Sequence, residues 1–154
     1  DWERAGFLTL CEGDMVDYRD VTAAVLEAAE LYDLQALGVD QHLTQTVTPV
    51  LQDAGILIIA IPQTMTGMSP AMKELERLIR KHEMLHVHNT CARWNFGNVR
   101  CAVDGNENIK PMKNRSIGRI DITVAWIIAM ATAIVRRTAP PDLNDALERG
   151  NYSM

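Results

Sequence analysis

One apolar segment near the end of the chain, Ile122–Val135, constrains the fold more than any other feature. No charged residue interrupts it, and Arg136 and Arg137 follow it, as suits the C-terminus of a helix. Its apolar residues recur at helical spacing and also cover the opposite face, which predicts a core helix that is buried all round. With fourteen residues, the segment is too short to span a bilayer, which takes about 20.

A single acid, Asp121, stands directly before this segment and would lie in the first turn of the helix. The helix dipole and the unpaired N–H groups favour an anion there, so a capping carboxylate is one interpretation. The other interpretation is a metal ligand held on a rigid helix. A basic stretch precedes the acid and contributes four cations, Lys110, Lys113, Arg115 and Arg119.

Composition narrows the class of protein. The chain has 154 residues, of which 47% are hydrophobic and 23% charged, and this suits one globular domain. Because the net charge is −5, a nucleic-acid role would need the cations gathered on one face. The three cysteines form no CxxC pair, which predicts reduced thiols in a cytosol-like compartment, with neither a disulfide framework nor a zinc site.

Strand-like and helix-like stretches alternate along the chain, which predicts a parallel α/β arrangement. Strands are expected at Gly6–Cys11, Leu34–Val39, Ile56–Ile61 and Val99–Val103, with a hairpin turn at Asp104–Gly105 and a return strand from Ile109. The apolar run Ile56–Ile61 is typical of a strand buried on both faces. Helices are expected over Tyr18–Tyr32 after a capping Asp17, over Gln41–Asp53 with a bend or break at Pro49, and from Ser69–Pro70 onward. The stretch Thr90–Asn98 is expected to be less regular.

Asp40 follows the second expected strand, at the edge where open α/β sheets place their ligands. Two carboxylates from separate elements, Asp40 and Asp121, suit a divalent cation, and we expect them to approach closely enough to share one. The histidines offer a zinc site as an alternative, but no cysteine or acid completes one at recognisable spacing. Solvated or hydrogen-bonded imidazoles are therefore predicted at His42, His82, His86 and His88.

Four blocks of sequence, in this order, resemble the nuclease domain of tailed-bacteriophage terminase large subunits. They are MSPAMKELERL, LHVHNTCARWNFGNV, DGNENIKPMKNRSIGRID and the apolar AWIIAMATA, and GFLTLCEGDMVDY ahead of them is similar too. The resemblance runs from about Gly6 to Arg137. It implies a ribonuclease H-like α/β fold, with a mixed sheet flanked by helices and a basic β-hairpin before the last core helix. The C-terminal nuclease domain would occupy residues 1–138 and a tail residues 139–154.

The resemblance also implies an activity, a metal-dependent endonuclease that cuts concatemeric double-stranded DNA during genome packaging, with Mg²⁺ or Mn²⁺ in a two-metal site. The GVD and RID motifs make Asp40 and Asp121 the second and third catalytic, metal-binding acids, and His86 matches a histidine of accessory role. Positions expected to meet the DNA backbone are Lys110, Lys113, Arg115 and Arg119. The terminase small subunit and the portal are expected partners of a full-length protein in the host cytoplasm, without a membrane.

The sequence departs from the family pattern in two places. Gln41–His42 follows the second acid where the family usually has Arg–Trp or a similar pair, and the strand with the first acid would lie upstream of Asp1. We therefore expect a domain that is incomplete at its N-terminus and a chain that alone is a poor or inactive nuclease. Two alternatives remain, a catalytically incomplete module that binds DNA or packaging partners, and a ribonuclease H-like resolvase.

Overall fold

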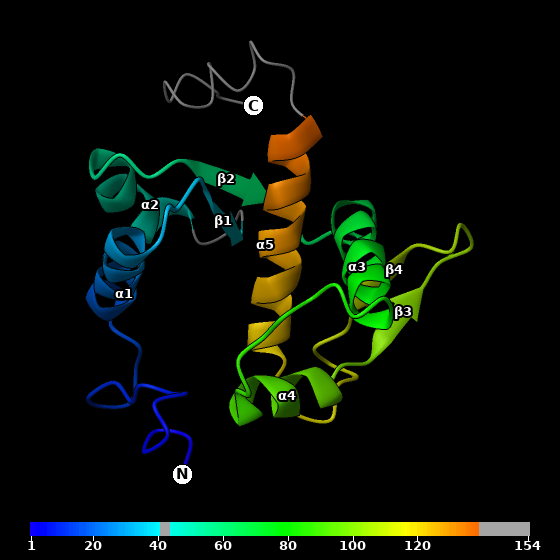
Figure 1. Cartoon of the computed structure of the whole chain (residues 1–154), viewed down its shortest axis with the longest axis horizontal. Coiled ribbons are helices and arrows are strands. Elements are labelled where there is room, and N and C mark those ends of the chain that lie inside the picture. The colour runs from blue at the N-terminus through cyan, green and yellow to red at the C-terminus, as the bar shows by residue number, and fades with distance from the viewer. Residues whose placement is uncertain (41–43, 139–154) are drawn as a thin grey trace. The chain divides into compact units, whose positions relative to one another are not determined.

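The computed structural model describes residues 1–40 and 44–138, and the chain divides into two compact units (Figure 1). Unit 1 comprises Asp1–Leu10 and Gln63–Ala131, and unit 2 comprises Cys11–Pro62 and the chain from Thr132 onward. The elements in chain order are α1 (Tyr18–Leu31), β1 (Leu37–Asp40), α2 (Thr44–Asp53), β2 (Ile58–Ile61), α3 (Met65–Arg80), α4 (Thr90–Gly97), β3 (Cys101–Val103), β4 (Ile109–Pro111) and α5 (Asp121–Thr138). Within the described ranges, no helix has the length and apolar character needed to cross a membrane.

A parallel pair of strands, β1 and β2, lies at the centre of unit 2, with Leu37 opposite Ile58 and Asp40 opposite Ile61. Helix α1 packs on α2, and α2 packs on β2. The predicted parallel pairing is thus confirmed. The prediction that β2 is buried on both faces is wrong, because Ala60 is exposed, as suits a strand with one neighbour in a two-stranded sheet.

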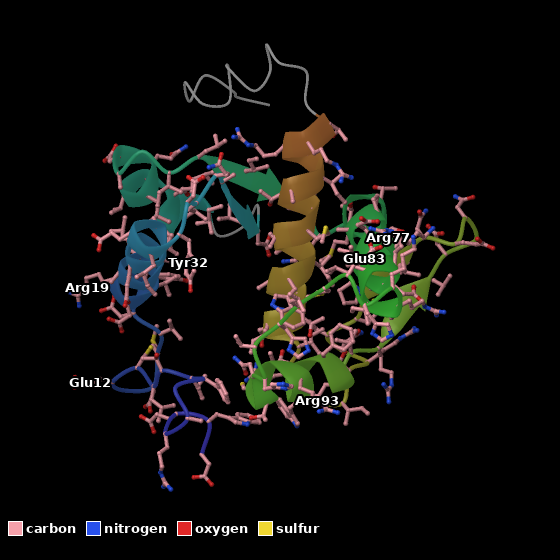
Figure 2. The ribbon with its side chains drawn as sticks, viewed as in Figure 1. Glu12, Arg19, Tyr32, Arg77, Glu83 and Arg93 are labelled. Atoms are coloured by element: carbon pink, nitrogen blue, oxygen red, sulfur yellow. The ribbon has the colours of Figure 1, made fainter. Side chains whose placement is uncertain are left out.

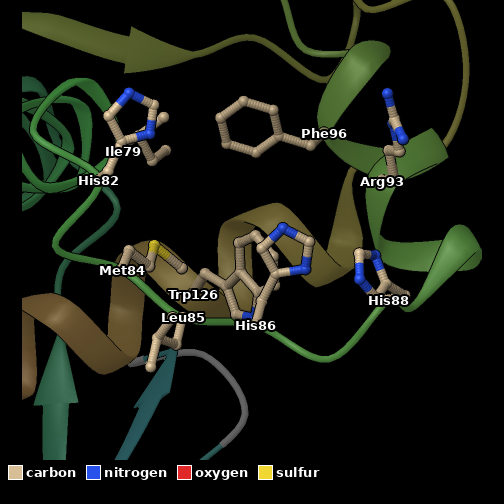
Figure 3. Close-up of a pocket in the computed structure, with 9 residues that line it drawn as sticks. All are labelled: Ile79, His82, Met84, Leu85, His86, His88, Arg93, Phe96 and Trp126. Carbon is tan, nitrogen blue, oxygen red and sulfur yellow. The ribbon is translucent and has the colours of Figure 1, made fainter.

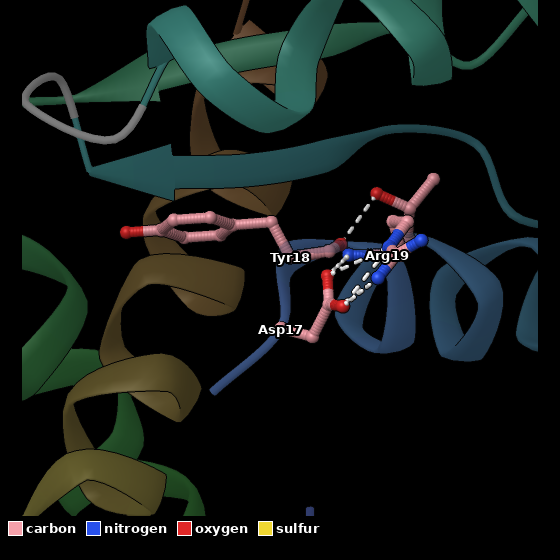
Figure 4. A network of polar contacts seen from close by, with 4 residues as sticks. Asp17, Tyr18 and Arg19 are labelled. Atoms are coloured by element: carbon pink, nitrogen blue, oxygen red, sulfur yellow. Dashed lines mark hydrogen bonds and ion pairs between the residues drawn. The ribbon is translucent and has the colours of Figure 1, made fainter. Parts of the chain in front are cut away.

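The helices of unit 2 begin largely where local chemistry predicts. Asp17 caps α1, because its Oδ1 accepts a hydrogen bond of 2.8 Å from the backbone N–H of Arg19 (Figure 4). The Arg19 side chain also donates to this carboxylate, and these hydrogen bonds lower the pKa of Asp17. Helix α2 runs through Pro49 as one helix instead of two pieces, since a proline removes only one intrahelical hydrogen bond and α1 and β2 hold the helix in place.

In unit 1, an antiparallel pair of strands, β3 and β4, packs beside α3. The Oγ of Ser69 accepts a hydrogen bond of 3.1 Å from the backbone N–H of Ile109, which ties α3 to β4. The expected helix start at Ser69–Pro70 is therefore wrong. Helix α3 begins one turn earlier, after Thr64, whose Oγ1 accepts a 3.0 Å hydrogen bond from Gly67 N–H. The strands form two separate two-stranded sheets in the described residues, so the α/β class is confirmed without a single mixed sheet.

Two further local predictions for unit 1 are wrong. The stretch expected to be irregular is the helix α4, capped by Asn89, whose Oδ1 accepts a 2.9 Å hydrogen bond from Ala92 N–H. The segment Gly6–Cys11, most of which belongs to unit 1, contains no strand, although its residues favour one. A β-rich composition forms a strand only where a neighbouring strand can pair with it.

Helix α5 begins at Asp121, as predicted, and its residues up to Ala131 belong to unit 1. One face is buried through Val124, Ile127, Ile128 and Ala131. The opposite row, with Ala125 and Ala129, is exposed, so the prediction of burial all round is wrong. Alanines four residues apart share one row of a helix, and this row adds little apolar surface.

Candidate functional site

The start of α5 is held by a side chain from another helix. Asn95 of α4 is buried, and its Oδ1 accepts a hydrogen bond of 3.1 Å from the backbone N–H of Ile122, the second residue of α5. This satisfies one of the N–H groups that the first turn of a helix leaves unpaired. Asn95 therefore performs the capping that one interpretation of the sequence gave to Asp121.

A second buried asparagine, Asn98, fixes the loop that leads into α5. The side-chain Nδ2 of Asn98 donates a hydrogen bond of 3.0 Å to the backbone carbonyl of Arg119. The backbone carbonyl of Asn98 accepts a hydrogen bond of 3.2 Å from the N–H of Ile117. Gly118 lies so close that a Cβ there would approach Asn98 Nδ2 to 2.8 Å. Helix α4 and its C-cap residue Asn98 thus position the residues on both sides of Asp121.

The Asp121 carboxylate is accessible and has a cationic neighbour. Its Oδ1 lies 3.2 Å from Nζ of Lys113, and the two side chains are 60% and 62% exposed. An exposed ion pair of this kind contributes about 0–1 kcal/mol. The carboxylate is therefore a hard oxygen ligand that a solvated cation can reach, with an ammonium group that exchanges easily.

The basic residues lie after β4, in the approach to α5. Lys113, Arg115 and Arg119 are exposed, and Lys110 is half-buried within β4. The cations of the expected basic β-hairpin therefore lie within and after β4, because the connection between β3 and β4 is acidic instead. There, hydrogen bonds from Asn108 lower the pKa of Asp104.

Asp40 ends β1 in unit 2, at the carboxyl end of a parallel strand as predicted, and it is half-buried. Asp121 lies in unit 1. Their shared metal therefore stays a prediction. In the part of the chain that the structure describes, no three His, Cys, Asp or Glu side chains are grouped as a metal site.

His86 lines a pocket in unit 1, and sequence reasoning missed this pocket (Figure 3). Its volume is about 610 Å³, and it is lined by Ile79, His82, Met84, Leu85, His86, His88, Arg93, Phe96 and Trp126. The Nδ1 of His86 lies 2.9 Å from the carbonyl of Val87 and donates to it, because a carbonyl only accepts. The prediction of a hydrogen-bonded imidazole is thus confirmed for His86, whereas His42 lies outside the described residues.

The segment that carries the histidines leaves α3 through a charged anchor. The Arg77 guanidinium bonds Glu74 of the same helix and, at 2.8 Å, Glu83 just beyond it (Figure 2). These hydrogen bonds raise the pKa of Arg77.

The sequence does contain a feature that could have indicated the pocket. The alternation His86-Val87-His88 stands shortly before Trp94 and Phe96, in the stretch that is expected to be irregular.

Comparisons with known proteins identify the family. The family model described as terminase large subunit, endonuclease domain, matches residues 1–136. Protein YmfN of Escherichia coli (strain K12) is 31% identical over 136 residues, covering 87% of this chain and 30% of that protein. The large terminase subunit of Enterobacteria phage HK97 is 29% identical over 141 residues, covering 86% and 27%. The crystal structure of the HK97 bacteriophage large terminase superposes with a TM-score of 0.78 at 26% identity, over 85% of this chain and 28% of that one. The chain therefore spans less than a third of the length of these relatives.

Proposed function

The chain belongs to the family of terminase large subunit endonuclease domains, and we propose that it forms part of a metal-dependent endonuclease that cuts concatemeric double-stranded DNA during phage genome packaging. The observation that carries the proposal is the family match over residues 1–136, which includes Asp40, Asp121 and the basic stretch before α5. The proposal extends to a ribonuclease H-like topology with a basic β-hairpin before α5. It also makes the terminase small subunit and the portal partners of the full-length protein.

We propose Mg²⁺ or Mn²⁺ as the cofactor, with Asp40 and Asp121 as carboxylate ligands and His86 as an accessory residue. The chemistry of these side chains fits such an ion, because both acids offer the hard oxygen ligands that it prefers. The Asp121 side chain is also 60% exposed, so an ion in solution can reach it. When bound, such an ion activates water and stabilises the charge that develops on the phosphate. The contribution of this chain is to hold Asp121 at the first turn of α5, which Asn95 fixes.

Lys113 has two roles in this proposal. With the metal absent, it neutralises the Asp121 carboxylate at 3.2 Å. Because the pair is exposed and weak, the ammonium group can change partner from Asp121 to a DNA phosphate. Its neighbours Arg115 and Arg119 are exposed on the same stretch and contact the DNA backbone.

Mn²⁺ affinity tests the metal assignment without relying on cleavage. Asp121→Asn should weaken Mn²⁺ binding by at least about tenfold, as measured by electron paramagnetic resonance of free Mn²⁺, because a ligand oxygen loses its charge. Asp20→Asn is the matched control, since Asp20 is also an exposed acid in the first turn of a helix. Lys113→Met should tighten Mn²⁺ binding a few-fold. Equal affinities for Asp121→Asn and Asp20→Asn would contradict the assignment.

Plasmid cleavage in Mn²⁺ tests the activity itself. We expect weak cleavage by this chain, and whatever cleavage occurs should disappear in Asp121→Asn and persist in Asp20→Asn. Cleavage that survives Asp121→Asn would mean that this acid is not part of the reaction. A chain that binds DNA but neither binds Mn²⁺ nor cleaves would favour the alternative of a binding module.

The salt dependence of duplex binding tests the basic stretch. Replacing Lys113, Arg115 and Arg119 with Gln should weaken binding to any duplex sequence. It should also reduce the slope of log affinity against log salt by about 0.9 for each lost phosphate contact. The control replaces three exposed cations of α3 and its C-cap, Lys73, Arg80 and Lys81, and removes the same charge. If both triple variants lower the slope equally, only net charge matters and the basic stretch is not a binding site.

A further inference from the structure

The pocket that His86 lines has the chemistry of a nucleotide site, and we propose that it holds one unstacked DNA nucleotide, with the base against Phe96 and Trp126 and the adjoining phosphate at Arg93. The pocket lies wholly within unit 1, and its volume of about 610 Å³ is within the ~300–1,000 Å³ of small-molecule sites. The inference rests on the proposed function in one respect, namely that DNA is the polymer that reaches this surface.

Aromatic rings make up part of the pocket lining. Trp126 of α5 is near two of them, with its ring centroid 6.2 Å from that of Phe96 and 6.4 Å from that of His86. The rings are tilted by 49° and 46°, so they support one another and leave a wedge instead of a parallel slot. A base would therefore stack on one ring face, and such stacking tolerates any base because every base has a π-face.

The polar groups of the pocket suit an anion that carries a hydrogen-bonding edge. Arg93 is always charged, and its planar fork matches a phosphate. Figure 3 shows Arg93 and Phe96 coming from the same helix, α4, while His88 lies on the same side of the opening as Arg93. Since Nδ1 of His86 donates to Val87, the neutral ring keeps Nε2 as an acceptor for an N–H of a base edge.

No carboxylate lines the pocket among the residues that the structure describes. The nearest acid in sequence, Glu83, is held by Arg77 at 2.8 Å, and so its charge is neutralised at the exit of α3. The local charge is therefore complementary to a phosphate, although the whole chain carries −5. A segment of a partner protein with an acidic and an aromatic side chain would suit the same walls, and the experiment below separates the two occupants.

The backbone at the edge of the pocket is held in an unusual conformation. His82 has a φ of 55°, in the left-handed region that favours glycine. Its N–H donates to the carbonyl of Ile79, and that of Glu83 donates to Leu78, which closes the C-terminus of α3 with both bonds of a Schellman motif. A histidine at this position lowers the stability of the fold relative to glycine. Its imidazole lines the pocket. Backbone strain of this kind clusters at ligand sites.

The walls also leave apolar surface exposed, and a bound base would cover part of it. Leu85 is 97% exposed and Phe96 43%, although both line the pocket. Contiguous exposed apolar groups rimmed by polar ones are typical of binding sites. Because the lining combines a cation and imidazoles with aromatic and aliphatic side chains, a nucleotide can contact both kinds of group at once.

Fluorescence of Trp126 tests the proposal directly. The ring centroids of Trp2 and Trp94 lie 5.3 Å apart with the rings tilted by 48°, and replacing both residues with Phe leaves Trp126 as the only tryptophan of the chain. This variant is titrated, in EDTA, with a thymidine octamer and with an octamer of the same backbone that lacks bases. Saturable quenching by the thymidine octamer is expected, with an affinity roughly 5- to 150-fold higher than that of the base-free octamer. Equal responses to the two octamers would overturn the proposal.

The two phenylalanines of the chain supply a matched pair of variants. Phe96→Leu should lower thymidine-octamer affinity at least about fivefold, whereas Phe7→Leu, outside the pocket, should leave it unchanged. Arg93→Gln should weaken both octamers alike, with Arg80→Gln as its control. If Phe96→Leu and Phe7→Leu bind equally, the pocket is not the nucleotide site, and a protein segment becomes its better occupant.

Mn²⁺ affinity, measured on the same variants, keeps the two proposals apart. Phe96→Leu should bind Mn²⁺ as the parent chain does, because Asp121 is not altered. Loss of Mn²⁺ binding in Asp121→Asn together with no base-dependent quenching would leave the endonuclease proposal intact and refute the pocket. Base-dependent quenching that Phe96→Leu abolishes would support the pocket even if Mn²⁺ does not bind.

Discussion

Removing the buried amide of Asn95 should destabilise unit 1 through the start of α5. In Asn95→Ala, the N–H of Ile122 loses the acceptor that lies 3.1 Å away and remains only partly accessible to water. Loss of a helix cap costs about 0.5–2 kcal/mol, and an unsatisfied buried donor about 1–3 kcal/mol. Both costs refer to the same hydrogen bond and are not added. We therefore expect the free energy of unfolding to fall by about 2 kcal/mol.

All three tryptophans lie in unit 1, so their fluorescence follows the unfolding of this unit in urea. The expected loss should lower the urea midpoint without changing the m-value. In a chain of this size, it corresponds to a fall of about 4–8 °C in Tm. Far-UV circular dichroism, which also reports unit 2, should show a smaller change if the two units unfold separately.

Asn106→Ala is the control for this prediction. Asn106 is exposed, and its only bond to Asp104 comes from its backbone N–H, which alanine keeps. Its stability should stay within about 0.5 kcal/mol of the parent chain. Asn95→Asp, which keeps an acceptor oxygen at the helix N-terminus, should recover part of the loss. If Asn95→Ala is as stable as Asn106→Ala, the cap contributes nothing and the reasoning is refuted.

Three further predictions concern stability and use the same urea measurement. Gly118→Ala should cost about 1–2 kcal/mol, because the new Cβ would displace Asn98 and weaken its bond to Arg119; unchanged stability would show that the loop adapts freely. Thr123→Val should gain up to about 1 kcal/mol, since the buried hydroxyl has no hydrogen-bond partner among the described residues, and a loss would indicate a bound water. Asp104 has a pKa lowered below its ordinary 3.8 in the fold, so its ionised form stabilises the fold above that pH. The stability difference between the parent chain and Asp104→Ala should therefore persist from neutral pH to about 3.8 and close as the pH falls further; a difference that does not depend on pH would contradict this.

Elements set by neighbouring residues could be predicted from the sequence. The cap of α1 by Asp17, the parallel strand that ends at Asp40 and the start of α5 at Asp121 all depend on contacts within a few positions or on the apolar pattern of one segment. Such contacts repeat wherever the same pattern occurs. The family resemblance, which rests on the order of several blocks, was confirmed by the match over residues 1–136.

Polar side chains with distant partners could not be predicted. Ser69 appeared to be a helix cap, but its hydroxyl accepts a bond from Ile109, 40 positions away. Asn95 appeared to be part of an irregular stretch, although it caps a helix that begins 26 positions later. Ser and Asn offer the same acceptor to nearby and distant N–H groups, so only the packing decides which one they serve.

The capping of α5 by Asn95 has a consequence for the proposed chemistry. The carboxylate of an acid that caps its own helix accepts hydrogen bonds from the backbone N–H groups of the first turn. Here the N–H of Ile122 is satisfied by Asn95, while the Asp121 carboxylate is 60% exposed and has Lys113 as its partner. In the proposed chemistry, Asn95 therefore has the structural role and Asp121 the ligand role, and a divalent cation would displace only the weakly paired, exposed Lys113. The same division predicts that Asn95→Ala lowers stability while Asp121→Asn does not. At a temperature where both variants are folded, only Asp121→Asn should weaken Mn²⁺ binding by about tenfold or more.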